Sequence, residues 1–172
     1  MPIHIPAEAL FMACAIGDAA AVSRLVPAGG SELNLCGPNF QHPYHKSTPL
    51  SLAAQGGHIE IVRMILERAP NTAVDYTVAI GYTALFVAGQ YHHADIVRLL
   101  AEHGASLNVA AGTRVATPLR CAVGQMPPEA PPRLPDPGGA RQVATVRALL
   151  RLGAGTPPPP PSPAPPHPLY PF

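Results

Sequence analysis

Hydrophobic residues in this chain come in pairs of short runs, each with the spacing of one helical face. In residues 48–66, Thr48 suits a helix N-cap because its hydroxyl accepts a backbone N–H, and Pro49 suits the first turn. The glycine pair at 56–57 ends that run, and the apolar residues of 59–66 recur on one side of a second helix. The pattern predicts a helix–turn–helix hairpin, whose small alanines let the two antiparallel helices approach closely.

The same pattern is repeated along the chain. Thr83 and Thr117 open later copies, at successive intervals of 35 and 34 residues counted from Thr48. A steady interval of this size predicts a stack of like units, because one hairpin cannot bury its apolar face alone.

The first and last copies are weaker than the two between them. The first copy has no Thr-Pro start, and its expected packing positions are Leu10, Met12, Ala13 and Cys14. The second helix of the last copy is delayed, and its expected packing positions are Val143, Val146, Leu149 and Leu150. We interpret these copies as the ends of the stack, each with a single neighbour.

The repeated unit resembles the ankyrin repeat, whose core reads roughly T-P-L-H-x-A-A-x-x-G-H-x-x-I-V-x-L-L-L-x-x-G-A-x-x-N. Residues 48–66 match nearly throughout, residues 117–122 and 143–154 match in two halves, and residues 83–108 match at Thr83, Leu85, Ala88, His93, Ile96, Val97, Leu99, Leu100, Gly104, Ala105 and Asn108. The resemblance implies an all-α fold, an α-solenoid of stacked helix-turn-helix repeats with projecting β-hairpin loops. It implies one repeat domain over residues 1–155, with repeats at about 8–46, 47–81, 82–115 and 116–155.

The chain departs from this family pattern at the helix start and at one turn. The histidine after T-P-L is replaced by Ser51, Phe86 and Arg120, so the hydrogen bonds that it usually makes are in doubt. His92 stands where the turn has a glycine, which predicts strain or a changed turn in the third repeat.

Proline is abundant, with 24 residues concentrated in two segments. The segment 126–140 reads as an insertion in the fourth repeat, and residues 156–172 read as a disordered tail. Residues 128–133 spell P-x-x-P-x-R, and residues 157–170 begin with five prolines. Polyproline-reading domains bind such segments, but a stiff tail without a partner is an equally simple explanation.

The composition narrows the function. With 12% charged residues and a net charge of +1, we expect neither nucleic-acid nor membrane-surface binding. No apolar run reaches the about 20 residues that cross a bilayer. The three cysteines lack C-x-x-C spacing and predict reduced thiols, hence a protein of the cytoplasm or nucleus.

Catalytic and metal-binding signals are absent from the sequence. There is no nucleophile elbow, phosphate loop or H-E-x-x-H motif, so we expect no enzyme activity and no cofactor. The pairs His42/His45 and His92/His93 have no further ligand at metal-binding spacing, so we expect no metal.

Arginine occupies one repeat position in three copies, at Arg63, Arg98 and Arg147. These side chains predict a ladder on the second helices. The ladder has two interpretations: a surface for an acidic partner, or a solvated face paired with Glu67 and Glu102 four residues on.

The resemblance also implies where a partner binds, namely the concave surface made by the loops and the first helix of each repeat. Mapped by repeat position, the predicted partner-binding residues are Tyr44, His45, Ser47, Gln55, Ile80, Tyr82, Gln90, Tyr91, Arg114 and Gln125. Tyrosine is enriched at binding hot spots. Tyr82 and Tyr91 would serve equally well to cover neighbouring repeats.

These observations favour a non-catalytic, monomeric module that binds a protein partner through the concave groove. Two alternatives stay open. The repeats would be a scaffold that presents segments 128–133 and 157–170 to polyproline-reading domains, or the chain would be an inhibitory or regulatory subunit of a kinase or other enzyme.

Overall fold

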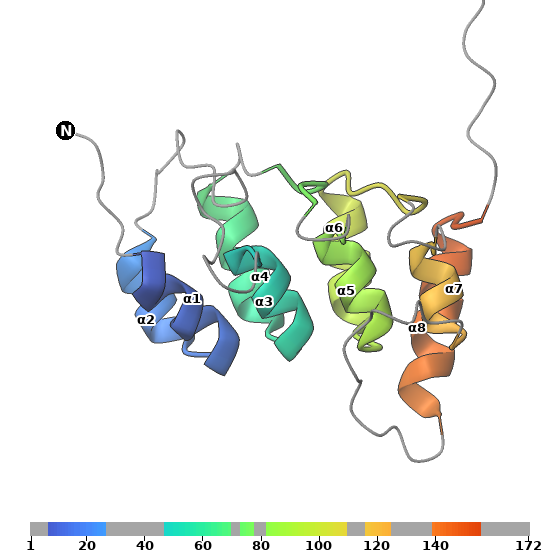
Figure 1. The fold of residues 1–172 in the computed structure, drawn as a ribbon, viewed down its shortest axis with the longest axis horizontal. Coiled ribbons are helices and arrows are strands. Elements are labelled where there is room, and N and C mark those ends of the chain that lie inside the picture. Colours follow the sequence, from blue (N-terminus) through green and yellow to red (C-terminus); the bar gives the residue numbers. More distant parts are fainter. Residues whose placement is uncertain are drawn as a thin grey trace, which may run out of the picture.

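The computed structural model describes residues 7–26, 47–69, 73–77, 82–109, 116–124 and 139–155. The described residues form eight helices (Figure 1): α1 (Ala7–Ile16), α2 (Ala19–Leu25), α3 (Pro49–Gly56), α4 (Ile59–Arg68), α5 (Ala84–Gln90), α6 (Ala94–Glu102), α7 (Pro118–Ala122) and α8 (Ala140–Arg151). The predicted tail, most of the insertion and most of the interrepeat loops fall outside the described residues, so their predicted structure stays a prediction.

The helices pair in chain order and stack in two rows. The first helices form one row, in which α1 packs on α3, α3 on α5 and α5 on α7; the second helices α2, α4, α6 and α8 form the other. The rows run from one end of the molecule to the other in sequence order (Figure 1). The predicted α-solenoid of helix pairs is therefore confirmed.

Threonine begins three of the first helices, as the sequence predicted. The hydroxyls of Thr48, Thr83 and Thr117 accept the backbone N–H three residues on. Ser51 completes a reciprocal capping box, because its hydroxyl oxygen accepts the N–H of Thr48 at 2.9 Å. A serine thus secures the helix start at the position where the family has histidine.

Turn histidines join the second repeat to the first and the third repeat to the second. His58 Nε2 lies 3.3 Å from the carbonyl oxygen of Ala15, and His93 Nε2 lies 3.1 Å from that of Gln55. A carbonyl oxygen can only accept, so each imidazole donates here. The first helix of one repeat is thereby tied to the turn of the next.

The core lies between the two rows and is built from fully buried aliphatic side chains, among them Leu10, Leu50, Leu85, Ile96 and Leu149. Burial of this apolar surface is the main favourable term for the stack. No helix among the described residues combines the length and apolar character needed to cross a bilayer.

Three expected core residues are instead exposed at the ends of the stack. Met12 on α1 has 57% of its surface accessible, and Val143 and Leu150 on α8 have 55% and 56%. The packing prediction was wrong for these positions. An end repeat has a neighbour on one side only, so part of its apolar surface has nothing to pack against.

Candidate partner-binding surface

The ends of α3 and α5 meet at a polar pair on the first-helix side. Gln55 lies near the end of α3 and is exposed, and Tyr91 follows α5 and is half-buried. The Gln55 Nε2 amide donates to the Tyr91 hydroxyl oxygen at 3.1 Å. Two predicted site residues that are 36 positions apart are therefore brought together across neighbouring repeats.

The chemistry of Tyr91 follows from its surroundings. Burial raises the pKa of its phenol above the ordinary value of 10.0, and the hydrogen bond from Gln55 acts in the opposite direction. The phenol is therefore neutral at physiological pH. Since its oxygen accepts from Gln55, its own proton can be donated to a carbonyl or carboxylate of a partner.

His93 fixes the backbone under this pair. Its imidazole donates to the Gln55 carbonyl, and burial lowers its pKa below 6.5; the bond to Gln55 opposes that shift, and the charges of Arg141 and His58 add to it. A neutral imidazole therefore holds the end of α3 in position at neutral pH.

Ser47 lies apart from the Gln55–Tyr91 pair. It immediately precedes the cap of α3 and is half-buried, whereas Gln55 is near the far end of that helix. Eight helical residues span about 12 Å, so one partner contact reaches both sites only by running along the helix.

Tyr82 and Gln90 are buried, with 7% and 1% of their surfaces accessible, contrary to the exposure that the prediction assumes. The Tyr82 ring stacks on Phe86, with ring centroids 4.6 Å apart and planes 7° from parallel. Val87, Ala116 and Cys121 complete this second apolar cluster. Phe86 stands where the family has histidine, and it provides the apolar ring on which the buried Tyr82 ring packs. A role for Tyr82 or Gln90 in partner binding stays a prediction.

Five predicted residues, Tyr44, His45, Ile80, Arg114 and Gln125, lie outside the described residues. Among the described residues, no three His, Cys, Asp or Glu side chains gather as a metal ion requires.

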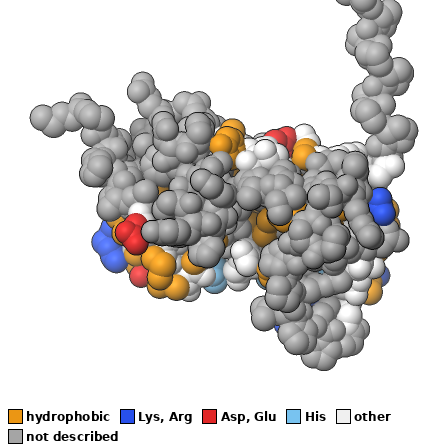
Figure 2. Space-filling model, in the orientation of Figure 1, with side chains coloured by type: hydrophobic (Ala, Val, Ile, Leu, Met, Phe, Trp, Pro, Cys, Tyr) orange, Lys and Arg blue, Asp and Glu red, His pale blue; other side chains and the backbone are white. Residues whose placement is uncertain are grey.

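The sequence analysis did not predict that α1, the first helix of the first repeat, exposes apolar residues. Ile16 has 67% of its surface accessible and stands one helical turn from Met12. Figure 2 shows hydrophobic side chains at the surface at the α1 end of the stack. Their spacing of four residues was visible in the sequence, but the periodicity did not reveal which side of the end repeat lies open.

Capped helix pairs stacked side by side, with the polar pair between two of them, define a helical-repeat protein. A family model described as ankyrin repeats in three copies matches residues 9–111. The chain therefore belongs to the ankyrin-repeat family, and the resemblance seen in the sequence is confirmed. Repeats of this family are generally protein–protein interaction modules and typically non-catalytic.

The match covers most of α1 and all of α2 to α6. Helices α7 and α8 lie beyond it, yet they pack on α5 and α6 as those helices pack on α3 and α4. The predicted domain limits and repeat boundaries stay predictions.

Proposed function

We propose that this chain is a non-catalytic binding module that holds a partner protein against the first-helix surface around Gln55 and Tyr91. The observation that supports this most is the hydrogen bond joining these side chains across α3 and α5 at the surface. The bond fixes the orientation of a large, partly exposed aromatic ring before any partner arrives.

Preorganisation of this kind favours binding. A side chain that is already held loses less conformational entropy when a partner covers it. Tyr91 offers rigid apolar area with a hydroxyl proton at its tip, and Gln55 offers an amide that both donates and accepts. An extended or helical backbone with accessible carbonyl groups matches this arrangement.

The test is a comparison of partner capture by the intact chain with capture by Tyr91→Ala and Gln55→Ala. Proteins retained by the intact chain are identified, purified and titrated by calorimetry. Loss of a hot-spot tyrosine costs about 2 kcal/mol, so Kd should rise roughly 30-fold in Tyr91→Ala. Tyr91→Phe, which removes only the hydroxyl, should give a smaller increase.

Arg63→Ala is the matched control, because Arg63 is exposed on α4, in the other row of helices. Thermal melts of all variants verify that the fold is kept. A partner that binds Tyr91→Ala and the intact chain equally would contradict the proposal. Deleting residues 156–172 in the same capture experiment separates binding at the Gln55–Tyr91 surface from the alternative in which the proline-rich tail recruits the partner.

A further inference from the structure

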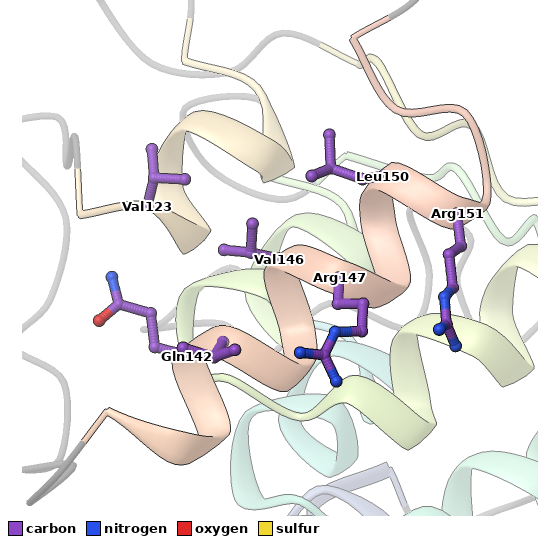
Figure 3. A pocket seen from close by; sticks show the side chains of 7 residues that line it. Val123, Gln142, Val146, Arg147, Leu150 and Arg151 are labelled. Atoms are coloured by element: carbon purple, nitrogen blue, oxygen red, sulfur yellow. The ribbon is translucent and has the colours of Figure 1, made fainter.

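The last helix pair carries an exposed apolar groove. Val123 after α7 and Val143 and Leu150 on α8 each have about half of their surfaces accessible, at 46%, 55% and 56%. With Val146 they line a hollow of about 430 Å³, which we call the α8 groove. Figure 3 shows the side chains of Val123, Val146 and Leu150 gathered on the same side of α8. Exposed apolar concavities of this size are typical of interaction sites.

Positive charge borders this groove. Arg147 and Arg151 belong to its lining and project away from the aliphatic side chains, along the other side of α8 (Figure 3). The same two residues line a second hollow, of about 300 Å³, together with Arg98 of α6. Helix α8 contains three arginines and no acidic residue.

Arg147 and Arg151 have no counterion in the part of the chain that the structure describes. The ion pair recorded there joins Arg98 to Asp95 within α6, and no described carboxylate lies within 4.0 Å of Arg147 or Arg151. The interpretation in which Arg98 pairs with Glu102 is wrong, because the ion-pair partner of Arg98 is Asp95, three positions before it. Within the described structure, two guanidinium groups without a carboxylate partner therefore stand beside the apolar groove.

We propose that the α8 groove binds an acidic, amphipathic peptide segment of a partner protein. The aliphatic side chains of the segment enter the groove between α7 and α8, and its Asp or Glu carboxylates pair with Arg147 and Arg151. Arginine suits this role because its planar fork binds a carboxylate in bidentate fashion. The site lies at the end of the stack, distinct from the Gln55–Tyr91 surface.

Charge and shape favour this occupant over three others. A two-fold contact pairs the same patch on both copies, and the lining of the α8 groove holds Arg147 and Arg151 but offers no Asp or Glu to neutralise them. The chain's own tail, residues 156–172, contains no Asp or Glu. An anionic bilayer would satisfy the arginines, but a surface that is flat on this scale leaves a concave groove unfilled.

The probe is a labelled 18-residue peptide in which Leu recurs with helical spacing and Glu occupies the flanking positions. Its binding to the full chain is followed by fluorescence anisotropy. We expect saturable binding that weakens between about 50 mM and about 300 mM salt, because partly exposed charge pairs are screened. The same peptide with Gln in place of Glu should bind about tenfold more weakly.

Two groove variants should each raise the peptide Kd about tenfold or more. They are Arg147→Glu/Arg151→Glu, which reverses the charge, and Leu150→Gln, which removes apolar contact. The matched control is Arg24→Glu/Arg63→Glu, which makes the same charge change at exposed positions on α2 and α4. Arg147→Gln/Arg151→Gln serves as a milder variant, and melting curves show that each protein is folded.

Several results would overturn the inference. The first is no binding of the Glu peptide to the intact chain. The second is a rise in peptide Kd for the Arg24→Glu/Arg63→Glu control equal to that of the groove variants. The third is equal affinity of the intact chain for the Glu and Gln peptides. Binding to phosphatidylserine vesicles that the peptide does not displace would assign the surface to membranes. Binding that appears only after Glu129→Gln/Asp136→Asn would show that the insertion supplies its own carboxylates. Tyr91→Ala should leave binding of the peptide to the α8 groove unchanged, because Tyr91 belongs to the other surface. Absence of peptide binding at the α8 groove would therefore not contradict the function proposed for Gln55 and Tyr91.

Discussion

At the scale of single residues, the residue type that a turn tolerates depends on the side chain that the next repeat packs over it. Gly57 has φ 77°, and a Cβ added there would lie 2.6 Å from the Cε1 atom of His93. Gly17 stands in the same relation to His58. His92 occupies the equivalent turn position in the third repeat with φ 62°, so the turn keeps its left-handed backbone, and of the two predicted outcomes strain at His92 is the one that the structure supports. In the fourth repeat the corresponding sequence position is Pro127, which lies outside the described residues.

Replacement of Gly57 by alanine tests this account. Gly57→Ala should lower the free energy of unfolding by about 2 kcal/mol, from left-handed backbone strain and displacement of His93 from Gln55. Gly104→Ala is the control, because Gly104 has φ 85° but no atom within 4 Å of the added Cβ. It should cost only about 1 kcal/mol. Equal losses in urea denaturation would show that the His93 contact contributes nothing.

At the scale of elements, α5 is the best-buried helix of the stack. All seven of its residues are buried, and it packs on α3, α6 and α7. Leu85, the second residue of α5, is fully inaccessible to solvent. A helix that short is not stable alone, so its structure depends on the neighbours that surround it.

Truncation of Leu85 should therefore be costly. Leu85→Ala leaves a cavity and should lower the free energy of unfolding by roughly 2–5 kcal/mol. Leu152→Ala is a suitable comparison, because Leu152 has 37% of its surface accessible and should lose far less. An unchanged melting temperature for Leu85→Ala would contradict its place in the core.

The histidine contact between α3 and the turn after α5 makes stability depend on pH. Burial lowers the pKa of His93 in the folded state below its ordinary 6.5. As pH falls through 6.5, the unfolded chain therefore takes up this proton first, and stability decreases. Above 6.5 this loss is absent.

We expect the free energy of unfolding to fall between about pH 7.5 and about pH 5.5, and to fall less in His93→Gln. Urea titrations at both pH values measure the difference. Since the chain has eight histidines, the variant is essential for assigning the effect to His93. An identical pH dependence in both proteins would remove His93 from the explanation.

At the scale of the whole molecule, stability is a sum of contacts between neighbouring repeats. Several bonds cross these boundaries in addition to the core. Arg68 Nη1 donates to the carbonyl oxygens of Ser23 and Val26, at 3.0 and 2.8 Å, and Asp75 accepts the N–H of Ser106 at 2.9 Å. End repeats make such contacts on one side only, so they should open first.

Hydrogen exchange measures this directly. Amides of α5 and α6 should exchange most slowly, and those of α1, α2, α7 and α8 faster, because local opening costs least where contacts are fewest. Mass spectrometry of peptic fragments gives the comparison. Uniform protection from α1 to α8 would show a single cooperative unit and contradict the nearest-neighbour picture.

Repetition let the sequence determine the architecture. The threonine caps and the periodic apolar positions required helical hairpins, and their steady interval required a stack. The repeat register also selected Gln55 and Tyr91 as candidates for one surface, although the hydrogen bond between them depends on side-chain positions that no periodicity encodes.

Tertiary structure alone decided which apolar side chains have a neighbour. Periodicity identifies the apolar side of a helix, whereas burial depends on what packs against that side. Val143 and Leu150 resemble core residues in the sequence, yet they line the exposed α8 groove because no repeat packs beyond them in the described structure. Tyr82 resembles a surface contact, yet its ring is buried in a cluster with Phe86, Ala116 and Cys121. Ala116 and Cys121 come from the next repeat, and local sequence cannot specify that contact.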